Sequence, residues 1–228
     1  MQKVCLIGWP GSGKSRFYQL IAPQLQALNL TVREANGLVW DIQQEVQEQA
    51  WLVLDARQRV ESPDELATLL NAADAQVLMF WQEVSLDNQA WWLKQLKSFA
   101  PAKPYALVMP SGLADAELIK LAAAPLSAQQ PDWPRLQRME FVLPKLVLEH
   151  FTFVLDAMQR DSTIQLWRAV GVVECLEFAN PVAIEAGRNW VYQYNAGDAQ
   201  AGWLRLEGVG LNQAVLCEWL SACYAPGN

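Results

Sequence analysis

Short apolar runs alternate with amphipathic segments along the first two thirds of the chain. Residues 3–7 form an apolar run that ends at a glycine, and residues 14–28 then carry apolar side chains at helical spacing. Strand-like runs follow at 30–34, 51–54, 76–81, 105–109 and 139–142, and helical patterns follow from 62, over 87–99, from near 115 and over 146–158. Strands that alternate with helices predict a mostly parallel sheet with helices on both faces.

The pattern changes after residue 160. Strand-like runs dominate at 164–178, 190–194 and 203–207, and one helix over 212–223 follows them. We therefore expect an α/β domain over residues 1–160 and a small α+β domain over residues 161–228.

Composition narrows the class of protein. The chain has 228 residues, of which 52% are hydrophobic and 18% charged, so it can bury an ordinary core. Its net charge is −7, and lysine and arginine do not cluster, so nucleic acid is not an expected partner. The apolar runs are shorter than the ~20 residues that span a bilayer, and the N-terminus lacks the apolar region of a signal peptide. We expect no membrane association and a cytoplasmic location.

The segment that follows the first apolar run carries the clearest motif. Residues 8–15 (GWPGSGKS) fit the pattern G-x-x-x-x-G-K-[ST], with a strand before it and a helix after it. Glycines let backbone amides approach phosphate oxygens, and the helix N-terminus attracts the anion. Lys14 is placed to reach the β- and γ-phosphates, and the Ser15 hydroxyl to ligate Mg²⁺. We therefore expect the fold of a P-loop NTPase and a bound GTP or ATP. The residues expected to contact the nucleotide are Gly8, Gly11, Ser12, Gly13, Lys14, Ser15 and Arg16.

Asp55 is the second candidate for the same site. It ends the apolar run at 51–54, which is the pattern of the Walker B strand, and a carboxylate there holds Mg²⁺ directly or through water. We expect Ser15 and Asp55 to hold Mg²⁺, and Lys14 and Asp55 to support any catalysis. Arg57 and Arg59 follow, and each is either a γ-phosphate contact or a solvated loop arginine.

Thiol and imidazole chemistry is not indicated. The four cysteines, Cys5, Cys175, Cys217 and Cys223, form no Cys-x-x-Cys pair, and His150 is the single histidine. We expect these cysteines to be small apolar residues in a reducing compartment, and no cysteine-ligated metal site.

The chain resembles the CobW family of P-loop GTPases. Besides the P-loop, residues 167–173 (WRAVGVV) look like the strand that opens the family's small C-terminal domain, and residues 204–208 (LRLEG) with 211–212 look like its late strand and the turn into the last helix. The resemblance implies a nucleotide-binding domain that takes GTP with Mg²⁺, and a C-terminal domain that contacts a partner.

Three family motifs are absent. The family's Cys-x-Cys-Cys metal motif lies before the Walker B strand, and residues 16–54 contain no cysteine. Residues 108–115 (VMPSGLAD) stand where the guanine-reading Asn-Lys-x-Asp is expected, and residues 55–58 (DARQ) replace the family's Glu-x-x-Gly. We therefore expect weak discrimination between GTP and ATP.

Three functions fit these observations. The first is a CobW-like nucleotide-binding protein, with or without slow NTPase activity, whose C-terminal domain contacts a protein partner or responds to the nucleotide. The second is a regulator or scaffold that binds nucleotide without hydrolysing it. The third is a small-molecule kinase, with residues 125–138, including Arg135 and Arg138, as a lid.

Overall fold

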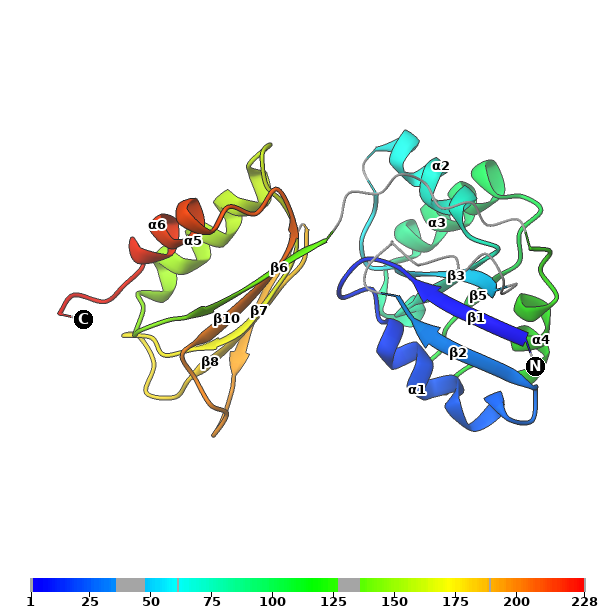
Figure 1. The fold of residues 1–228 in the computed structure, drawn as a ribbon, viewed down its shortest axis with the longest axis horizontal. Coiled ribbons are helices and arrows are strands. Elements are labelled where there is room, and N and C mark those ends of the chain that lie inside the picture. Colours follow the sequence, from blue (N-terminus) through cyan, green and yellow to red (C-terminus); the bar gives the residue numbers. More distant parts are fainter. Residues whose placement is uncertain (1, 36–47, 61, 127–135, 189, 228) are drawn as a thin grey trace. The chain divides into compact units, whose positions relative to one another are not determined.

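The chain forms two compact units, Met1–Trp133 and Pro134–Asn228 (Figure 1). The computed structural model describes residues 2–35, 48–60, 62–126, 136–188 and 190–227. Within these ranges, no helix has both the length and the apolar character needed to cross a bilayer. Each unit has its own sheet and its own hydrophobic core.

The first unit is built on five parallel strands in the order β2-β1-β3-β4-β5. The strands are β1 (Gln2–Ile7), β2 (Leu30–Glu34), β3 (Glu48–Asp55), β4 (Ala75–Met79) and β5 (Tyr105–Leu107). The central strand β3 is buried over almost its whole length, because helices cover both faces of the sheet. The predicted parallel α/β sheet is confirmed for this unit.

The helices of the first unit pack against both faces (Figure 1). They are α1 (Lys14–Leu25), α2 (Pro63–Ala72), α3 (Leu86–Phe99) and α4 (Asp115–Ala122), with a short 3₁₀ helix η1 (Trp81–Glu83) after β4. Helices α1 and α4 share one buried cluster with alternate residues of the strands. The predicted start of α2 is confirmed, since Ser62 Oγ accepts a hydrogen bond from the Glu65 amide at 3.3 Å.

The order of the strands fixes where a ligand can bind. From β1 the chain continues to β2 on one side, and then returns to β3 on the other side of β1. The loops that follow β1 and β3 therefore diverge at the carboxyl edge of the sheet, which is where open α/β sheets bind ligands. The predicted P-loop follows β1 and Asp55 ends β3, so the fold brings both to this edge.

The second unit is an antiparallel sheet in the order β6-β10-β7-β8-β9. Its strands are β6 (Gln137–Val142), β7 (Gln165–Val173), β8 (Val182–Ala186), β9 (Val191–Asn195) and β10 (Trp203–Val209). Helices α5 (Leu148–Arg160) and α6 (Gln213–Ser221) lie on one face of the sheet (Figure 1). Buried residues of both helices belong to the apolar core of this unit. This is the α+β arrangement that the sequence predicts.

The boundary between the units lies earlier than the expected 160/161. Strand β6 pairs along its length with β10, for example Phe141 opposite Leu204, and α5 contacts β7 and α6. Both elements therefore belong to the second unit. The spacing of hydrophobic residues predicts that this strand and this helix exist. It does not predict which other elements they pack against. Strand β8 is the one strand of this sheet outside the predicted runs.

Candidate functional site

The loop between β1 and α1 passes very close to the neighbouring strands. Gly8, Gly11 and Gly13 have φ angles of 152°, 83° and 96°. A Cβ atom on Gly8 would lie 2.3 Å from the carbonyl oxygen of Val53, and one on Gly13 would lie 3.1 Å from Met79 Cγ. Only glycine fits both the left-handed backbone and the close approach, so the motif glycines are needed for the shape of the loop.

The N-terminus of α1 is free to meet an anion. Its N-cap is Gly13, no side chain in the described ranges caps it, and its first turn holds no acidic residue. The first amides of a helix lack intrahelical acceptors and carry the positive end of the helix dipole. The Ser12 side chain is 4% exposed, and its hydroxyl has no hydrogen-bond partner among the described residues. A ligand oxygen would satisfy these donors.

Lys14 folds back over the loop. Its Nζ donates to the carbonyl oxygens of Gly8 at 2.6 Å and Trp9 at 3.2 Å. The Ser12 amide also donates to the Trp9 carbonyl at 3.1 Å, so the loop is closed on itself. The ammonium group is thereby held beside the loop amides, where a phosphate would be cradled.

Ser15 faces a carboxylate that the sequence argument did not single out. Its Oγ donates to Glu34 Oε2 at 2.8 Å, and Glu34 is the last residue of β2. Because the hydroxyl acts as the donor in this hydrogen bond, the lone pairs of the Ser15 oxygen stay available for a ligand. The sequence does show an acidic residue at the end of a strand. Its closeness to Ser15 becomes evident only once the strand order places β2 beside β1.

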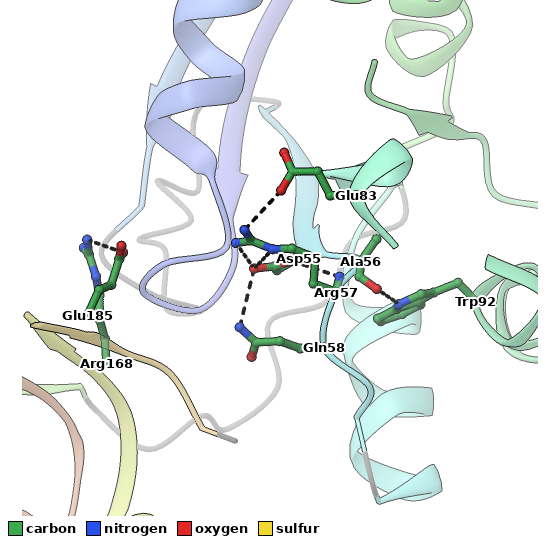
Figure 2. A network of polar contacts seen from close by, with 8 residues as sticks. All are labelled: Asp55, Ala56, Arg57, Gln58, Glu83, Trp92, Arg168 and Glu185. Atoms are coloured by element: carbon green, nitrogen blue, oxygen red, sulfur yellow. Dashed lines mark hydrogen bonds and ion pairs between the residues drawn. The ribbon is translucent and has the colours of Figure 1, made fainter. Parts of the chain in front are cut away.

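Asp55 is not an open carboxylate. Its side chain is 5% exposed, and Arg57 holds it with a two-pronged contact (Figure 2). Arg57 Nη2 lies 2.7 Å from Oδ2, Nε lies 3.0 Å from Oδ1, and the Arg57 amide donates to Oδ1 at 2.9 Å. The Arg57 side chain is 30% exposed, so it is not the solvated loop arginine that was one of its two expected roles.

Phe80 lies between the first turn of α1 and Arg57. The Arg57 guanidinium is 3.8 Å from the centre of the Phe80 ring, and that of Arg16 is 5.1 Å from it. Phe80 has φ 59°, an uncommon conformation for an aromatic residue. Arg57 also pairs with Glu83 at 3.3 Å. The Arg16 side chain faces Phe80, and its contact with a nucleotide stays a prediction.

The loop after β3 is anchored by α3. Trp92, which is buried, donates its indole N–H to the Ala56 carbonyl at 2.9 Å (Figure 2). Arg59, further along the loop, donates to Asn88 Oδ1 at 2.7 Å and lies 5.6 Å from the Trp91 ring centre. The two loop arginines therefore have different surroundings, and Arg57 is the one at Asp55.

A small cavity opens between the carboxyl ends of β4 and β5. Its walls are largely apolar and include Arg16, Phe80, Trp81, Met109 and Pro110. The turn beyond β5 is closed by the Gly112 amide, which donates to the Met109 carbonyl at 2.9 Å. Asp115 begins α4, and its Oδ1 accepts from Gln24 Nε2 at 2.7 Å.

Two other expectations concern metal and a lid. No group of three or more His, Cys, Asp or Glu side chains comes together within the described ranges, and the absence of a cysteine-ligated metal stays a prediction. Of the proposed lid, Arg135 lies outside the described residues. Arg138 lies in β6 and pairs with Glu207 of β10 at 2.8 Å, so this end of the segment belongs to the sheet.

No family model matches the chain, and no curated protein matches it. Among solved structures, the Zn(II)-bound YjiA GTPase from E. coli is similar with 10% sequence identity and a TM-score of 0.36, over 99% of each chain. A Zn(II)-bound triple mutant of the YjiA GTPase gives the same identity and TM-score, over 98% of this chain and 99% of that one. Such a likeness establishes neither a shared fold nor a family.

The structure itself gives the fold class. The chain consists of a parallel α/β unit, which has a glycine-rich loop at its topological switch point, and an antiparallel α+β unit.

Proposed function

We propose that the chain binds a nucleoside triphosphate at the loop of residues 8–15. The observation that carries this proposal is the free N-terminus of α1, preceded by glycines in left-handed conformation and placed at the switch point between β1 and β3. The phosphates accept hydrogen bonds from the amides of Gly13 to Arg16 and from Ser12. Backbone amides and a helix dipole together make such a loop selective for phosphate.

Lys14 supplies the positive charge. Its ammonium group is held by two neutral carbonyls, those of Gly8 and Trp9. Phosphate oxygens carry a full negative charge and accept stronger hydrogen bonds than carbonyls do. On binding, Lys14 exchanges the carbonyls for the β- and γ-phosphates with little movement of the backbone.

Mg²⁺ is the proposed metal, and its two expected ligands differ in fit. Mg²⁺ prefers oxygen ligands, and the lone pairs of the Ser15 oxygen are available because its O–H donates a hydrogen bond to Glu34. The Asp55 oxygens accept hydrogen bonds from Arg57, so the carboxylate fits the metal only after Arg57 has moved. When bound, the metal would supply positive charge beside the phosphates, with Ser15 as the residue placed to hold it.

The base site is proposed to accept either adenine or guanine. Beside Phe80, the exposed Met109 offers apolar surface for a base to pack on, outside the small cavity. Asp115, the acidic residue nearest the expected guanine motif, is held by Gln24 in the first turn of α4. A site that reads a base by shape and stacking discriminates weakly.

A slow CobW-like NTPase and a non-catalytic nucleotide-binding regulator both remain candidates for the biological role. The second is favoured by the Arg57 contact, which keeps Asp55 from a catalytic metal. The kinase is disfavoured because Arg138 is fixed in the second sheet. We propose a partner-binding role for the second unit, since Phe178, Tyr192 and Tyr194 are exposed on it. A cytoplasmic location stays a prediction.

The proposal is tested by calorimetric titration with ATP, GTP, adenosine and guanosine, each with and without Mg²⁺. The expected result is one binding site for both triphosphates and far weaker binding of the nucleosides, because the phosphates provide most of the contacts. Equal binding of a nucleoside and its triphosphate would contradict the proposal. Absence of triphosphate binding in every condition would also contradict it.

A further inference from the structure

We infer that Arg57 competes with Mg²⁺ for Asp55, so that the ion pair acts as a lock on the metal site. The inference rests on the proposed function and specifies how that site is regulated. In the locked arrangement Arg57 neutralises Asp55. Metal and nucleotide together have to displace the guanidinium before Asp55 can become a ligand.

The hydrogen bonds around Asp55 leave little room for a metal. Oδ1 accepts from the Arg57 amide at 2.9 Å and from Arg57 Nε at 3.0 Å. Oδ2 accepts from Arg57 Nη2 at 2.7 Å, and Gln58 Nε2 lies 3.4 Å from it. A carboxylate has about four lone-pair positions, and these contacts use them. Mg²⁺ binds oxygen at about 2.1 Å in near-octahedral geometry, and both donors at Oδ1 and the closer donor at Oδ2 belong to Arg57, so Arg57 competes with the metal at each oxygen.

The position of Arg57 is fixed from several sides. Its guanidinium stacks on Phe80, with 3.8 Å to the ring centre, and its Nη1 lies 3.3 Å from Glu83. The pair with Asp55 is largely removed from solvent, since the carboxylate is 5% exposed and the arginine 30%. Charge-assisted, two-pronged contacts between arginine and carboxylate are among the stronger polar contacts in proteins. The lock is therefore a defined arrangement of three side chains around one guanidinium.

The same aromatic ring connects the lock to the phosphate loop. A Cβ on Gly13 would lie 3.2 Å from Phe80 Cε2, so the ring rests against the start of α1. Arg16, in the first turn of that helix, faces the ring at 5.1 Å. Phe80 is held at φ 59°, and such strain in a bulky residue marks a site that the surrounding structure holds in place. A shift of the loop around bound phosphates would therefore move the Phe80 ring, and the ring would in turn displace the Arg57 guanidinium that stacks on it.

Arg59 provides a matched control. It lies two residues further along, carries the same charge, and contacts Asn88 and Trp91 rather than Asp55. Arg57→Gln and Arg59→Gln therefore change the net charge of the loop equally, and only the first releases Asp55.

The experiment measures the affinity of a fluorescent ATP analogue as a function of Mg²⁺ concentration. It compares the wild-type chain with Arg57→Gln, Arg59→Gln and Asp55→Asn. We expect Arg57→Gln to lower the Mg²⁺ concentration for half-maximal effect at least about tenfold, as loss of a charge-assisted contact would. We expect Arg59→Gln to match the wild type and Asp55→Asn to lose most of the Mg²⁺ effect.

A second variant covers the case in which Arg57→Gln does not fold. Arg57→Lys keeps the charge but loses the two-pronged contact, and it is expected to shift the Mg²⁺ midpoint in the same direction by a smaller factor. Unchanged Mg²⁺ dependence in the folded Arg57 variants would overturn the lock and leave the proposed function standing. Failure of every variant and of the wild type to bind the analogue would overturn both.

Discussion

The Ser15 hydroxyl donates to Glu34 Oε2 at 2.8 Å, which joins the first turn of α1 to the end of β2. A hydroxyl whose proton is fixed in this way presents its lone pairs in one direction. Glu34 thus positions the Ser15 oxygen for the proposed metal, although it is absent from the motif itself.

Glu34→Ala is expected to weaken Mg²⁺-dependent nucleotide binding about tenfold, the usual effect of losing a hydrogen bond to a charged group. Mg²⁺-free binding should change little, because Glu34 acts through the metal ligand. The measurement is a double-mutant cycle with Ser15→Ala. If the two residues act together, the double variant is no worse than Ser15→Ala alone, whereas full additivity would show that they act independently.

Trp92→Phe is expected to lower the free energy of unfolding by about 1–3 kcal/mol. The substitution removes the indole N–H that the Ala56 carbonyl accepts and leaves that carbonyl unpaired at a buried position. Urea denaturation checks the value. Trp91→Phe serves as the control, because Trp91 is only partly buried, and an equal loss in both variants would indicate that ring packing rather than the hydrogen bond is responsible.

The sequence predicts the first unit well and the pairing of the later elements poorly. The alternation of strands and helices and the cap at Ser62 depend on local patterns of residues, and such patterns can be recognised in a single sequence. The pairing of β6 with β10 and the contact between Ser15 and Glu34 join residues that are distant along the chain. Nothing in the spacing of apolar residues specifies those contacts.

The role of Arg57 at the site could not be predicted from the sequence either. The sequence places Asp55 at a strand end correctly, and the two arginines that follow look equivalent. Their difference arises because the chain turns back after β3, which brings the Arg57 amide and side chain onto the same carboxylate. Arg59 then extends to Asn88 instead.

Thiol labelling tests the burial of the cysteines. Cys217 is exposed, whereas Cys5, Cys175 and Cys223 are buried. Burial raises the pKa of Cys175 to about 11 and that of Cys223 to about 11. Since the thiolate is the nucleophile, a raised pKa slows alkylation further.

Iodoacetamide at about pH 8, close to the ordinary pKa of a thiol, should therefore modify one thiol per native chain. Mass spectrometry of the labelled peptides should identify that thiol as Cys217, and Cys217→Ser should abolish the fast phase. Unfolding in urea should expose all the thiols. Rapid native labelling of Cys175 or Cys223 would contradict the described core of the second unit.

Discrimination between GTP and ATP is expected to be within about tenfold, or roughly 1.4 kcal/mol. The turn after β5, where the resemblance to the CobW family leads us to expect the guanine-reading motif, contains Pro110, and Asp115 is engaged by Gln24. Competition titration of both nucleotides against one fluorescent analogue decides the point. A preference for GTP above a hundredfold would mean that another residue reads the base.

The most direct test of the central claim is triphosphate binding by Lys14→Ala, measured by calorimetry beside the wild type. Lys94→Ala, which removes an exposed lysine from α3, is the control for charge. We expect Lys14→Ala to lose about tenfold to a hundredfold in affinity while its unfolding curve stays unchanged, because the lysine donates hydrogen bonds to neutral loop carbonyls in the free protein and would meet charged phosphates in the complex. Equal affinity in Lys14→Ala, Lys94→Ala and the wild type would contradict the assignment of this loop as the phosphate site.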